Sequence, residues 1–523
     1  MVKSMNAAYW VQRWCELQPE KTALLMDGRH ITYKELFRRT QSVACWLQDA
    51  GIEKGDRIAV LLDNCVEFIE LYLASSLLGA IFVPFNFRLT AEEVDYLIRH
   101  SRPRLFVYSS RFRKTVTNLK LPAYKPPLVT AEVGSQEGSS DVLDYHRETE
   151  SFDGQVPFVT PSLGPADPEE PQVIMYTSGT TGRPRGAVLT HRKTFFNCLN
   201  AEIFFQLAFD DVMLIALPLF HSGGLFIQAS PSLYKGATIL LHRRFDAERV
   251  YQDIERFRVT KFLGVPTIFR SLLALDPEKR ADISSLRVCA VGGEKVPPEL
   301  LVQSWQAGFP LRQVMGQTET SILLWASEQE SIRKPGTAGK PVFHAEVSLI
   351  DSQGRPVRPG EVGEIVVRGS ITMKEYWQDP EHTEQVMAGG WLRTGDLARK
   401  DDDGYYYLVD RVKEMYISGG ENVYPAEVER VLREHPHVQD AAVVGVPDPV
   451  WGEVGHAFVI SKNAASVSES ELLQYCREKL ASFKVPKHVT FCTEFPRTPL
   501  GKIRKFMLLE MVSDKEQATV PDR

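Results

Sequence analysis

A run of glycines and hydroxyl side chains between residues 176 and 186 is the stretch best suited to chemistry. It reads Tyr-Thr-Ser-Gly-Thr-Thr-Gly-Arg-Pro-Arg-Gly. Glycines let the backbone turn its N–H groups inward around an anion, and hydroxyls add further donors. The run lacks the Gly-Lys-Ser/Thr of the common nucleotide loop, because Arg183 follows Gly182. It predicts a polyphosphate loop, with a hydrophilic turn as the alternative that the other motifs must exclude.

Alternating strands and helices are predicted to position this loop. Apolar runs at residues 57–62 and 81–84 indicate buried strands, and a helix between them extends to about Leu78. Further strands are predicted at residues 105–108, 173–176, 187–189, 213–218, 237–241, 261–265 and 288–291. Such alternation is typical of α/β layers. Residues 133–170 are rich in Gly, Ser, Pro and acidic side chains, which predicts a loosely ordered connection.

The pattern changes twice in the second half of the chain. Residues 336–368 show alternating strands and tight turns, typical of a small antiparallel β unit. After residue 411, an amphipathic helix at 425–434 and strands at 439–446 and 456–460 predict a compact α+β domain. The predicted fold class is therefore α/β: a large N-terminal domain of α/β sheets plus a small β unit, with a small mobile α+β C-terminal domain.

Composition indicates a soluble globular protein. The 523 residues exceed one ordinary core, and 43% are hydrophobic and 24% charged. A net charge of -6 argues against nucleic acid as the main partner. The seven scattered cysteines fit reduced thiols, and no signal peptide or transmembrane segment is evident, so we expect a cytoplasmic protein. The basic piece at residues 242–244 is open to two interpretations, a peripheral membrane contact or, with more weight, a solvated helix face.

Several separated motifs share the order of a known family. They are Pro218-Leu-Phe-His221-Ser-Gly-Gly224, Val291-Gly-Gly-Glu294, Gly316-Gln-Thr-Glu-Thr320, Gly390-Trp-Leu-Arg-Thr-Gly-Asp396, Asp410-Arg-Val-Lys413, Ser418-Gly-Gly-Glu-Asn-Val-Tyr-Pro425 and Pro496-Arg-Thr-Pro-Leu-Gly-Lys502. Taken singly, Glu319, Asp396 or Lys502 fits an ordinary surface position, and His221 fits a helix cap. The ordered set resembles the adenylate-forming (ANL) superfamily of acyl-CoA synthetases, adenylation domains and luciferases, over nearly the whole chain.

This resemblance implies a two-step reaction that uses ATP, Mg²⁺ and coenzyme A. A carboxylate attacks the α-phosphate of ATP, and a thiol then attacks the acyl carbon. The resemblance also implies an N-terminal adenylation domain over residues 1–410, a hinge at 411–413 and a C-terminal lid domain over 414–523. Rotation about Lys413 would replace Lys502 by the Ser418 segment, which would form the CoA channel.

The resemblance gives catalytic roles to Lys502, Thr318, Glu319 and His221. Thr318 would contact the α-phosphate, Glu319 would hold Mg²⁺, and Lys502 would bridge the two reacting anions. The remaining nucleotide and CoA contacts that it implies are Thr177, Ser178, Gly179, Thr180, Thr181, Gly182, Arg185, Gly292, Gly293, Glu294, Met315, Gly316, Gln317, Asp396, Arg411, Lys413, Ser418, Gly419, Gly420 and Glu421. Two residues depart from the family: Arg185 stands where lysine is usual, and Met315 where an aromatic residue usually stacks on adenine.

The motifs also bear on the acid. His221 stands where amino-acid-activating relatives carry aspartate, and Gly316 stands where acetate-specific relatives carry tryptophan. We expect position 316 to face the acyl chain, with apolar neighbours at Phe220, Leu225, Phe226, Ile322 and Leu323. No cation is evident for a second carboxylate. A medium- or long-chain fatty acid is the first expectation. The alternatives are an aryl, alicyclic or carnitine-type acid, a luciferase-type oxygenase, and a non-catalytic nucleotide-binding regulator; a homodimer is left open.

Overall fold

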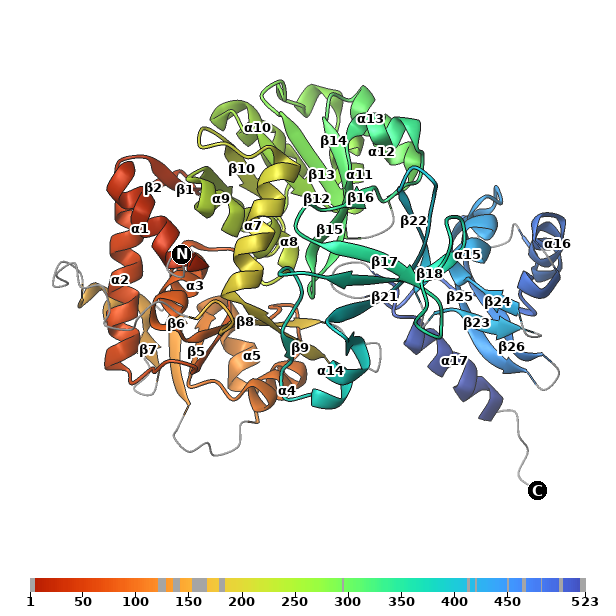
Figure 1. The fold of residues 1–523 in the computed structure, drawn as a ribbon, viewed down its shortest axis with the longest axis horizontal. Coiled ribbons are helices and arrows are strands. Elements are labelled where there is room, and N and C mark those ends of the chain that lie inside the picture. Colours follow the sequence, from red (N-terminus) through yellow and green to blue (C-terminus); the bar gives the residue numbers. More distant parts are fainter. Residues whose placement is uncertain are drawn as a thin grey trace. The chain divides into compact units, whose positions relative to one another are not determined.

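The computed structural model describes most of the chain (Figure 1). The described residues are 5–120, 128–134, 142–152, 167–177, 184–293, 296–411, 414–418, 421–448, 451–462, 467–480, 482–497 and 502–517. The chain divides into two compact units, the first of residues 1–178, 184–347 and 367–392, and the second of residues 179–183, 348–366 and 393–523. The second unit also takes in segments before residue 410, and the domain boundary expected there stays a prediction. The hinge stays a prediction, because residues 412 and 413 lie outside the described part.

An eight-stranded sheet carries the strand before the predicted phosphate loop. Its order is β19 (Glu375–Tyr376), β9 (Arg185–Thr190), β8 (Pro171–Thr177), β4 (Ile81–Pro84), β3 (Arg57–Leu61), β5 (Leu105–Ser109), β6 (Val129–Val133) and β7 (Leu143–Asp144). Strands β3 to β8 pair in parallel, whereas β9 and β19 are antiparallel. The central strands are apolar throughout because both faces of a parallel sheet are buried. The predicted strands at 57–62, 81–84, 105–108, 173–176 and 187–189 are thereby confirmed.

Helices accompany this sheet as the alternation predicted. They are α2 (Tyr33–Asp49), α3 (Val66–Leu78), α4 (Ala91–Ser101), η2 (Ser110–Phe112), α5 (Arg113–Thr117) and α6 (Tyr145–Glu150). Helix α3 ends at Leu78 because Gly79 adopts a left-handed φ of 69°, which a glycine takes without strain. Figure 1 shows α2 and α3 beside α1 (Ala7–Leu17), and these three helices contact one another.

A nine-stranded sheet carries most of the other motifs of the first unit. Its order is β16 (Lys340–Pro341), β15 (Ser321–Ala326), β14 (Leu311–Gln317), β13 (Val288–Gly292), β12 (Lys261–Gly264), β10 (Val212–Ile215), β11 (Thr238–Leu241), β1 (Thr22–Met26) and β2 (Arg29–Thr32). Strands β10 to β14 are parallel, so their carboxyl ends share one edge, and that edge is where ligands bind in open α/β sheets. The motifs at 291–294 and 316–320 begin in the last two residues of β13 and β14, and the motif at 218–224 begins just beyond the end of β10.

Helices and short helical turns also accompany the nine-stranded sheet, most of them between its successive strands. They are α7 (His191–Phe205), α8 (Ser222–Gly224), η3 (Leu225–Ala229), α9 (Ser230–Lys235), α10 (Ala247–Phe257), α11 (Pro266–Ala274), η4 (Pro277–Lys279), α12 (Pro298–Gln306) and α13 (Glu328–Arg333). Helix α7 begins directly after β9 and also contacts β15, so it connects one strand of each sheet.

Buried polar side chains join the two sheets of the first unit. Asn64, just after β3, donates through Nδ2 to the carbonyls of Leu217 (3.0 Å) and His242 (2.9 Å), and its Oδ1 accepts from Leu219 N at 2.8 Å. Because all these atoms are buried, losing one partner would leave an unsatisfied group. The segment that leads to His221 is thereby held against the end of β3.

The second unit is built on two smaller sheets. The first of these sheets has the strand order β17 (Glu346–Ile350), β18 (Val362–Arg368), β21 (Trp391–Lys400) and β20 (Met387–Ala388), and β22 (Tyr406–Arg411) pairs with β21. Some of these strands begin in the first unit, which also holds helix α14 (Pro380–Val386). The other orders β24 (Glu421–Val423), β23 (Tyr416–Ser418), β26 (Gly452–Ser461) and β25 (Val438–Asp448), with β27 (His488–Phe491) on β26. With α15 (Pro425–Arg433), α16 (Glu469–Lys479), η5 (Ser482–Lys484) and α17 (Lys505–Gln517), the second sheet confirms the α+β prediction.

Two local predictions are corrected. The connection at 133–170 holds β7 and α6, where the buried Tyr145 donates its phenol to Glu70 Oε2 at 2.8 Å, so part of it is firmly packed. The basic piece at 242–244 is not a solvated helix face, because it lies in the connection between β11 and α10. His242 within it is fully buried, and its Nε2 lies 2.8 Å from Asp253 Oδ2. Within the described part of the chain, the helices are too short or too polar to cross a membrane.

Candidate active site

Nine of the predicted site residues lie outside the described part of the chain. They are Ser178, Gly179, Thr180, Thr181, Gly182, Glu294, Lys413, Gly419 and Gly420. For Arg411 and Glu421 the structure describes the backbone but not the side chain. Their roles stay predictions, and the site is built from the residues around them.

The two ends of the predicted phosphate loop are held together by a hairpin. Strands β8 and β9 pair antiparallel up to Thr177 opposite Arg185, and Thr177 Oγ1 donates to the Arg185 carbonyl at 3.5 Å. At the base of the hairpin, the Tyr176 phenol bonds His100 Nδ1 at 2.8 Å. A Cβ on Gly186 would approach the side chain of Ile174 to 2.7 Å, so glycine permits the close pairing here. The loop therefore leaves from a rigid base.

Tyr376 connects this hairpin to the acidic motif. It lies on β19 opposite Ala187 of β9, and its ring lies 5.8 Å from the Arg185 guanidinium. Its phenol donates to Glu319 Oε1 at 2.9 Å. Burial, and then the Glu319 carboxylate, raise the pKa of the Tyr376 phenol, so the tyrosine stays a proton donor. Arg185 also lies 3.6 Å from Asp379, the residue that caps α14.

Thr318 and Glu319 lie in the turn between β14 and β15. Both are largely buried, at 8% and 7% exposed. Met373 N donates to the Glu319 carbonyl at 2.7 Å, and Thr320 N donates to the Gln317 carbonyl at 3.2 Å. The turn ends at Ser321, a non-glycine residue with a φ of 58°. Glu319 is thus held through both its backbone carbonyl and its carboxylate, at the carboxyl edge of the nine-stranded sheet.

The expectation that position 316 faces the acyl chain is wrong in this structure. A Cβ on Gly316 would lie 1.7 Å from the carbonyl oxygen of Ser321 on the paired strand β15. The register of β14 and β15 shifts between Met315 and Gly316, and this irregularity brings the two backbones together. Glycine is required there by backbone packing, so an indole would disrupt the turn that holds Glu319 before it could shorten an acyl pocket.

The other residues predicted to contact the nucleotide flank the same edge. Met315 is 9% exposed and pairs with Leu324. Gly292 ends β13, and a Cβ there would approach the Val314 carbonyl oxygen to 2.1 Å, while Gly293 has a φ of 85°. Gly292 therefore allows the ends of β13 and β14 to lie close together, and Gly293 allows the left-handed backbone that follows.

His221 begins the glycine turn after β10. Its Nδ1 accepts from Gly223 N at 3.2 Å, so the histidine caps the short helix α8, which is the ordinary role considered for it in the sequence. In a neutral ring this bond leaves the proton on Nε2. The π-helical turn η3 follows directly, where the Gln228 amide donates to the Gly223 carbonyl at 3.1 Å. The apolar neighbours expected at this place are all buried: Phe220, Leu225, Phe226, Ile322 and Leu323.

In the second unit, Asp396 and Arg411 are direct cross-strand partners on β21 and β22. Asp396 is 9% exposed, and its backbone N–H donates to Thr394 Oγ1 at 3.2 Å. Glu364 supports the turn before it, accepting from Gly395 N at 3.0 Å and from Arg393 Nε at 2.8 Å. The register therefore pairs the two residues expected to hold the ribose.

The C-terminal candidates lie on local hairpins of the same unit. Ser418 is buried on β23 opposite Glu421 of β24. Lys502 is exposed, next to Ile503, which bridges to Arg497. The Asp410 carboxylate accepts from Ala426 N at 2.9 Å, in the first turn of α15, so it caps that helix.

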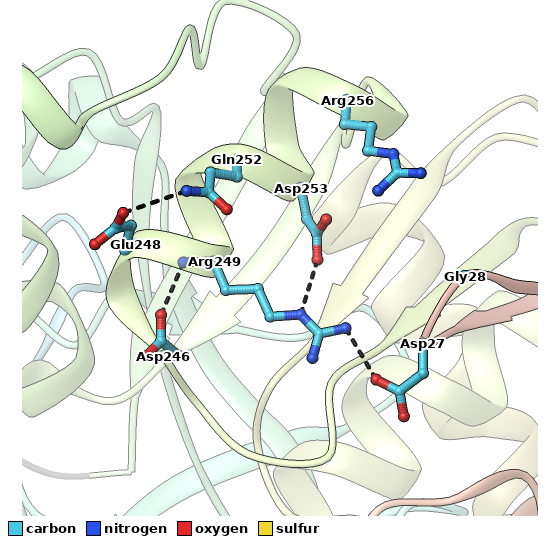
Figure 2. Close-up of a pocket in the computed structure, with 8 residues that line it drawn as sticks. All are labelled: Asp27, Gly28, Asp246, Glu248, Arg249, Gln252, Asp253 and Arg256. Carbon is cyan, nitrogen blue, oxygen red and sulfur yellow. Dashed lines mark hydrogen bonds and ion pairs between the residues drawn. The ribbon is translucent and has the colours of Figure 1, made fainter.

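A surface pocket of about 480 Å³ lies apart from these motifs in the sequence (Figure 2). Its lining residues are Asp27, Gly28, Asp246, Glu248, Arg249, Gln252, Asp253 and Arg256. Figure 2 shows Arg249 reaching both Asp27 Oδ1 (3.0 Å) and Asp253 Oδ2 (3.3 Å). This pairing neutralises the central cation, and no predicted site residue lines the pocket.

Sequence reasoning missed two residues that support the candidate site, Tyr376 and Asn64. Tyr376 lies 57 residues beyond Glu319, and Asn64 lies 153 residues before Leu217. The only local signal was the aromatic pair Tyr376-Trp377 between two recognised motifs. Contacts over such separations leave no local pattern to read.

Comparisons with known proteins agree with this geometry. Residues 11–377 match the model of the AMP-binding enzyme family, and residues 427–502 match that of the AMP-binding enzyme C-terminal domain. A feruloyl-CoA synthase of Amycolatopsis sp is 39% identical over 505 residues, covering 96% of this chain and 98% of that protein. The long-chain-fatty-acid–CoA ligase FadD13 of Mycobacterium tuberculosis is 34% identical over 534 residues, covering 99% of each chain.

A solved structure gives the same result. The O-succinylbenzoate coenzyme A synthetase (MenE) of Bacillus subtilis, in complex with ATP and magnesium ion, superposes with a TM-score of 0.83 at 33% identity, covering 96% of this chain and 99% of that one. The ordered motifs, the family models and these relatives lead to one conclusion: the chain belongs to the AMP-binding enzyme family, in the acyl-CoA synthetase branch of the adenylate-forming superfamily.

Proposed function

We propose that this AMP-forming acid–CoA ligase activates an apolar carboxylic acid, with an aryl-substituted acid as the first candidate. The observation that supports the site best is the buried Glu319 carboxylate, held by the Tyr376 phenol beside the base of the phosphate-loop hairpin. A fixed anion at the carboxyl edge of a parallel sheet, near the strand ends that flank a glycine- and hydroxyl-rich sequence, suits a metal-bound polyphosphate.

The first half-reaction joins the acid to the nucleotide. The carboxylate oxygen bonds to the α-phosphorus of ATP, the bond to the bridging oxygen breaks, and pyrophosphate leaves. Two anions approach each other, so the site needs cations and oriented donors. We assign Thr318 to the α-phosphate, Arg185 to the departing pyrophosphate, and Lys502 to the two reacting anions.

The residues present fit Mg²⁺. Mg²⁺ prefers oxygen ligands and is usually held by one or two carboxylates together with substrate phosphates. Glu319 would supply such a carboxylate, and the Tyr376 phenol holds it through Oε1. Held there, Mg²⁺ would supply positive charge that offsets the charge developing on pyrophosphate. Among the described residues no cluster of three His, Cys, Asp or Glu side chains competes for the metal.

The second half-reaction transfers the acyl group to coenzyme A. The thiol sulfur bonds to the acyl carbon, AMP leaves with its phosphate, and the thiol proton is released. For this step we assign the channel to Ser418, Gly419 and Gly420, reached after rotation about Lys413. The paired positions of Asp396 and Arg411 would keep the ribose in place through both steps.

The acid is chosen by the surroundings of His221. The rings of Phe220 and Phe87 meet edge to face at 5.2 Å, and aromatic pairs of this kind accept a further flat ring well. The feruloyl-CoA synthase relative supports an aryl acid by its name. A fatty acid is the second candidate, supported by the FadD13 relative and by the buried aliphatic residues Leu225, Ile322 and Leu323.

The test is acid-dependent exchange of radioactive pyrophosphate into ATP, followed by acyl-CoA formation. The panel comprises ferulate, cinnamate, indole-3-acetate, 2-succinylbenzoate, octanoate, palmitate and acetate. We expect the highest kcat/KM with an aryl acid and a CoA thioester as product. A preference for palmitate by tenfold or more would replace the aryl proposal by the fatty-acid one. Absence of exchange with every acid would contradict the activity itself.

A further inference from the structure

Helix α7 carries a lysine at a position that physical chemistry disfavours. Lys193 is fully buried in the first turn of the helix, where its own N–H donates to the cap Thr190 at 3.2 Å. A cation near a helix N-terminus opposes the helix dipole, and a lysine is rarely buried without a paired charge. Burial lowers the pKa of Lys193 to about 7, although the Glu319 carboxylate raises it. A residue with these costs calls for a compensating role.

The lysine is anchored to the turn that ends the acidic motif. Lys193 Nζ donates to Ser321 Oγ at 2.6 Å. Ser321 has a φ of 58°, a left-handed conformation that costs a non-glycine residue free energy unless its surroundings hold it. The bond from Lys193 supplies such a hold two residues beyond Glu319.

One helical turn further on, Asn197 extends this attachment. Its Oδ1 accepts from Ile322 N at 3.4 Å, and its amide donates to the Phe226 carbonyl. Lys193 and Asn197 therefore bind consecutive residues of β15 from one face of α7. The helix therefore supports the end of the Thr318–Ser321 turn, whereas Tyr376 binds the Glu319 side chain within it.

We propose that Lys193 is a positioning residue for the adenylation half-reaction: it holds Ser321, and through it the Thr318–Glu319 turn. This inference rests on the proposed function and extends it to a residue that touches neither nucleotide nor acid. Because Glu319 is assigned to the metal and pyrophosphate, the support matters when pyrophosphate is present. The transfer of the acyl group to CoA takes place after pyrophosphate has left and should depend on it far less.

The test compares the two half-reactions in Lys193→Met, with Lys261→Met as the matched control. Lys261 is also buried, at 2% exposed, but it lies on β12 with Nζ 3.5 Å from Asp211 Oδ2. We expect Lys193→Met to lower kcat for pyrophosphate exchange at least tenfold, while supplied acyl-adenylate is converted to acyl-CoA within twofold of the wild-type rate. Lys261→Met should leave the ratio of the two rates unchanged.

A second substitution separates positioning from general packing. Glycine adopts a left-handed φ without strain, so Ser321→Gly in the Lys193→Met background should regain part of the lost exchange rate. If Lys193→Met does not fold, Ser321→Ala removes the acceptor alone and should lower exchange selectively.

Three results would overturn the inference: exchange within twofold of wild type in a folded Lys193→Met or Ser321→Ala protein, equal losses in both half-reactions, or no recovery in the double variant. Failure of the proposed function is distinguishable, because wild-type protein would then show no acid-dependent exchange.

Discussion

The Tyr376–Glu319 hydrogen bond offers a direct test of the site. Tyr376→Phe removes one hydroxyl and keeps the ring that packs near Arg185. The lost bond is 2.9 Å long and runs from a neutral phenol to a buried carboxylate. Bonds to charged groups contribute about 1.5–3 kcal/mol. At about 1.4 kcal/mol per tenfold in rate, this corresponds to roughly 10- to 100-fold, the range also found when partners of metal ligands are removed.

The assay is pyrophosphate exchange at saturating acid, with Mg·ATP varied. We expect kcat/KM for Mg·ATP to fall by about 10- to 100-fold, because Glu319 loses the group that orients it. Conversion of supplied acyl-adenylate to acyl-CoA should change little, since pyrophosphate takes no part in it.

Tyr145→Phe is the matched control. Like the partly buried Tyr376, the fully buried Tyr145 donates its phenol to a buried carboxylate, here Glu70 at 2.8 Å. Its loss should lower the Tm and leave exchange intact below that temperature. The reasoning is refuted if Tyr376→Phe keeps its kcat/KM for Mg·ATP within twofold of wild type, or if the control loses as much exchange.

Four further outcomes are expected. Lys502→Ala should lose most of the adenylation rate and still convert supplied acyl-adenylate; equal losses in both steps would remove Lys502 from its assigned role. Lys413→Pro, which fixes φ, should retain pyrophosphate exchange and fail in thioester formation, and normal thioester rates would contradict the hinge. Gly316→Ala should lower both Tm and exchange, because its Cβ would meet the Ser321 carbonyl oxygen at 1.7 Å; a variant of wild-type stability would mean that the strands separate readily. Burial lowers the pKa of His191 to about 4, so the native state resists a proton that the unfolded chain takes up below about 6.5. Stability should therefore fall as the pH drops from about 6.5 to 4, by about 2 kcal/mol at pH 5, and His191→Gln should flatten this dependence in thermal melts.

Much of the architecture was readable from local patterns. The parallel strands β3, β4 and β5 are buried on both faces, so they appear as continuous apolar runs of the right length. The end of α3 was equally plain, because Gly79 follows the last helical residue and supplies the left-handed cap. The order of separated motifs then indicated the family, since each motif is a local string.

Other elements could not be read in this way. The segment at 133–170 looked like an open connection because its composition is polar, yet Tyr145 within it packs against Glu70, which lies 75 residues away. Residues 242–244 looked like a solvated face because they are basic, yet the next helix, α10, supplies Asp253 to the buried His242. In both cases the partner that explains the residue lies on another element.

Residue types and their order along the chain were enough to predict the α/β class, which the structure confirms, whereas the phosphate loop and the metal-binding role of Glu319 stay predictions. Only the tertiary structure showed that Tyr376 and Lys193 approach this acidic turn from β19 and α7, because they come from segments far from it in sequence. The same holds for Gly316. Its sequence context suggested an open acyl pocket, but the register shift between Met315 and Gly316 turns that position against the Ser321 backbone. The direction in which a residue faces depends on strand pairing, and strand pairing is a property of the folded sheet.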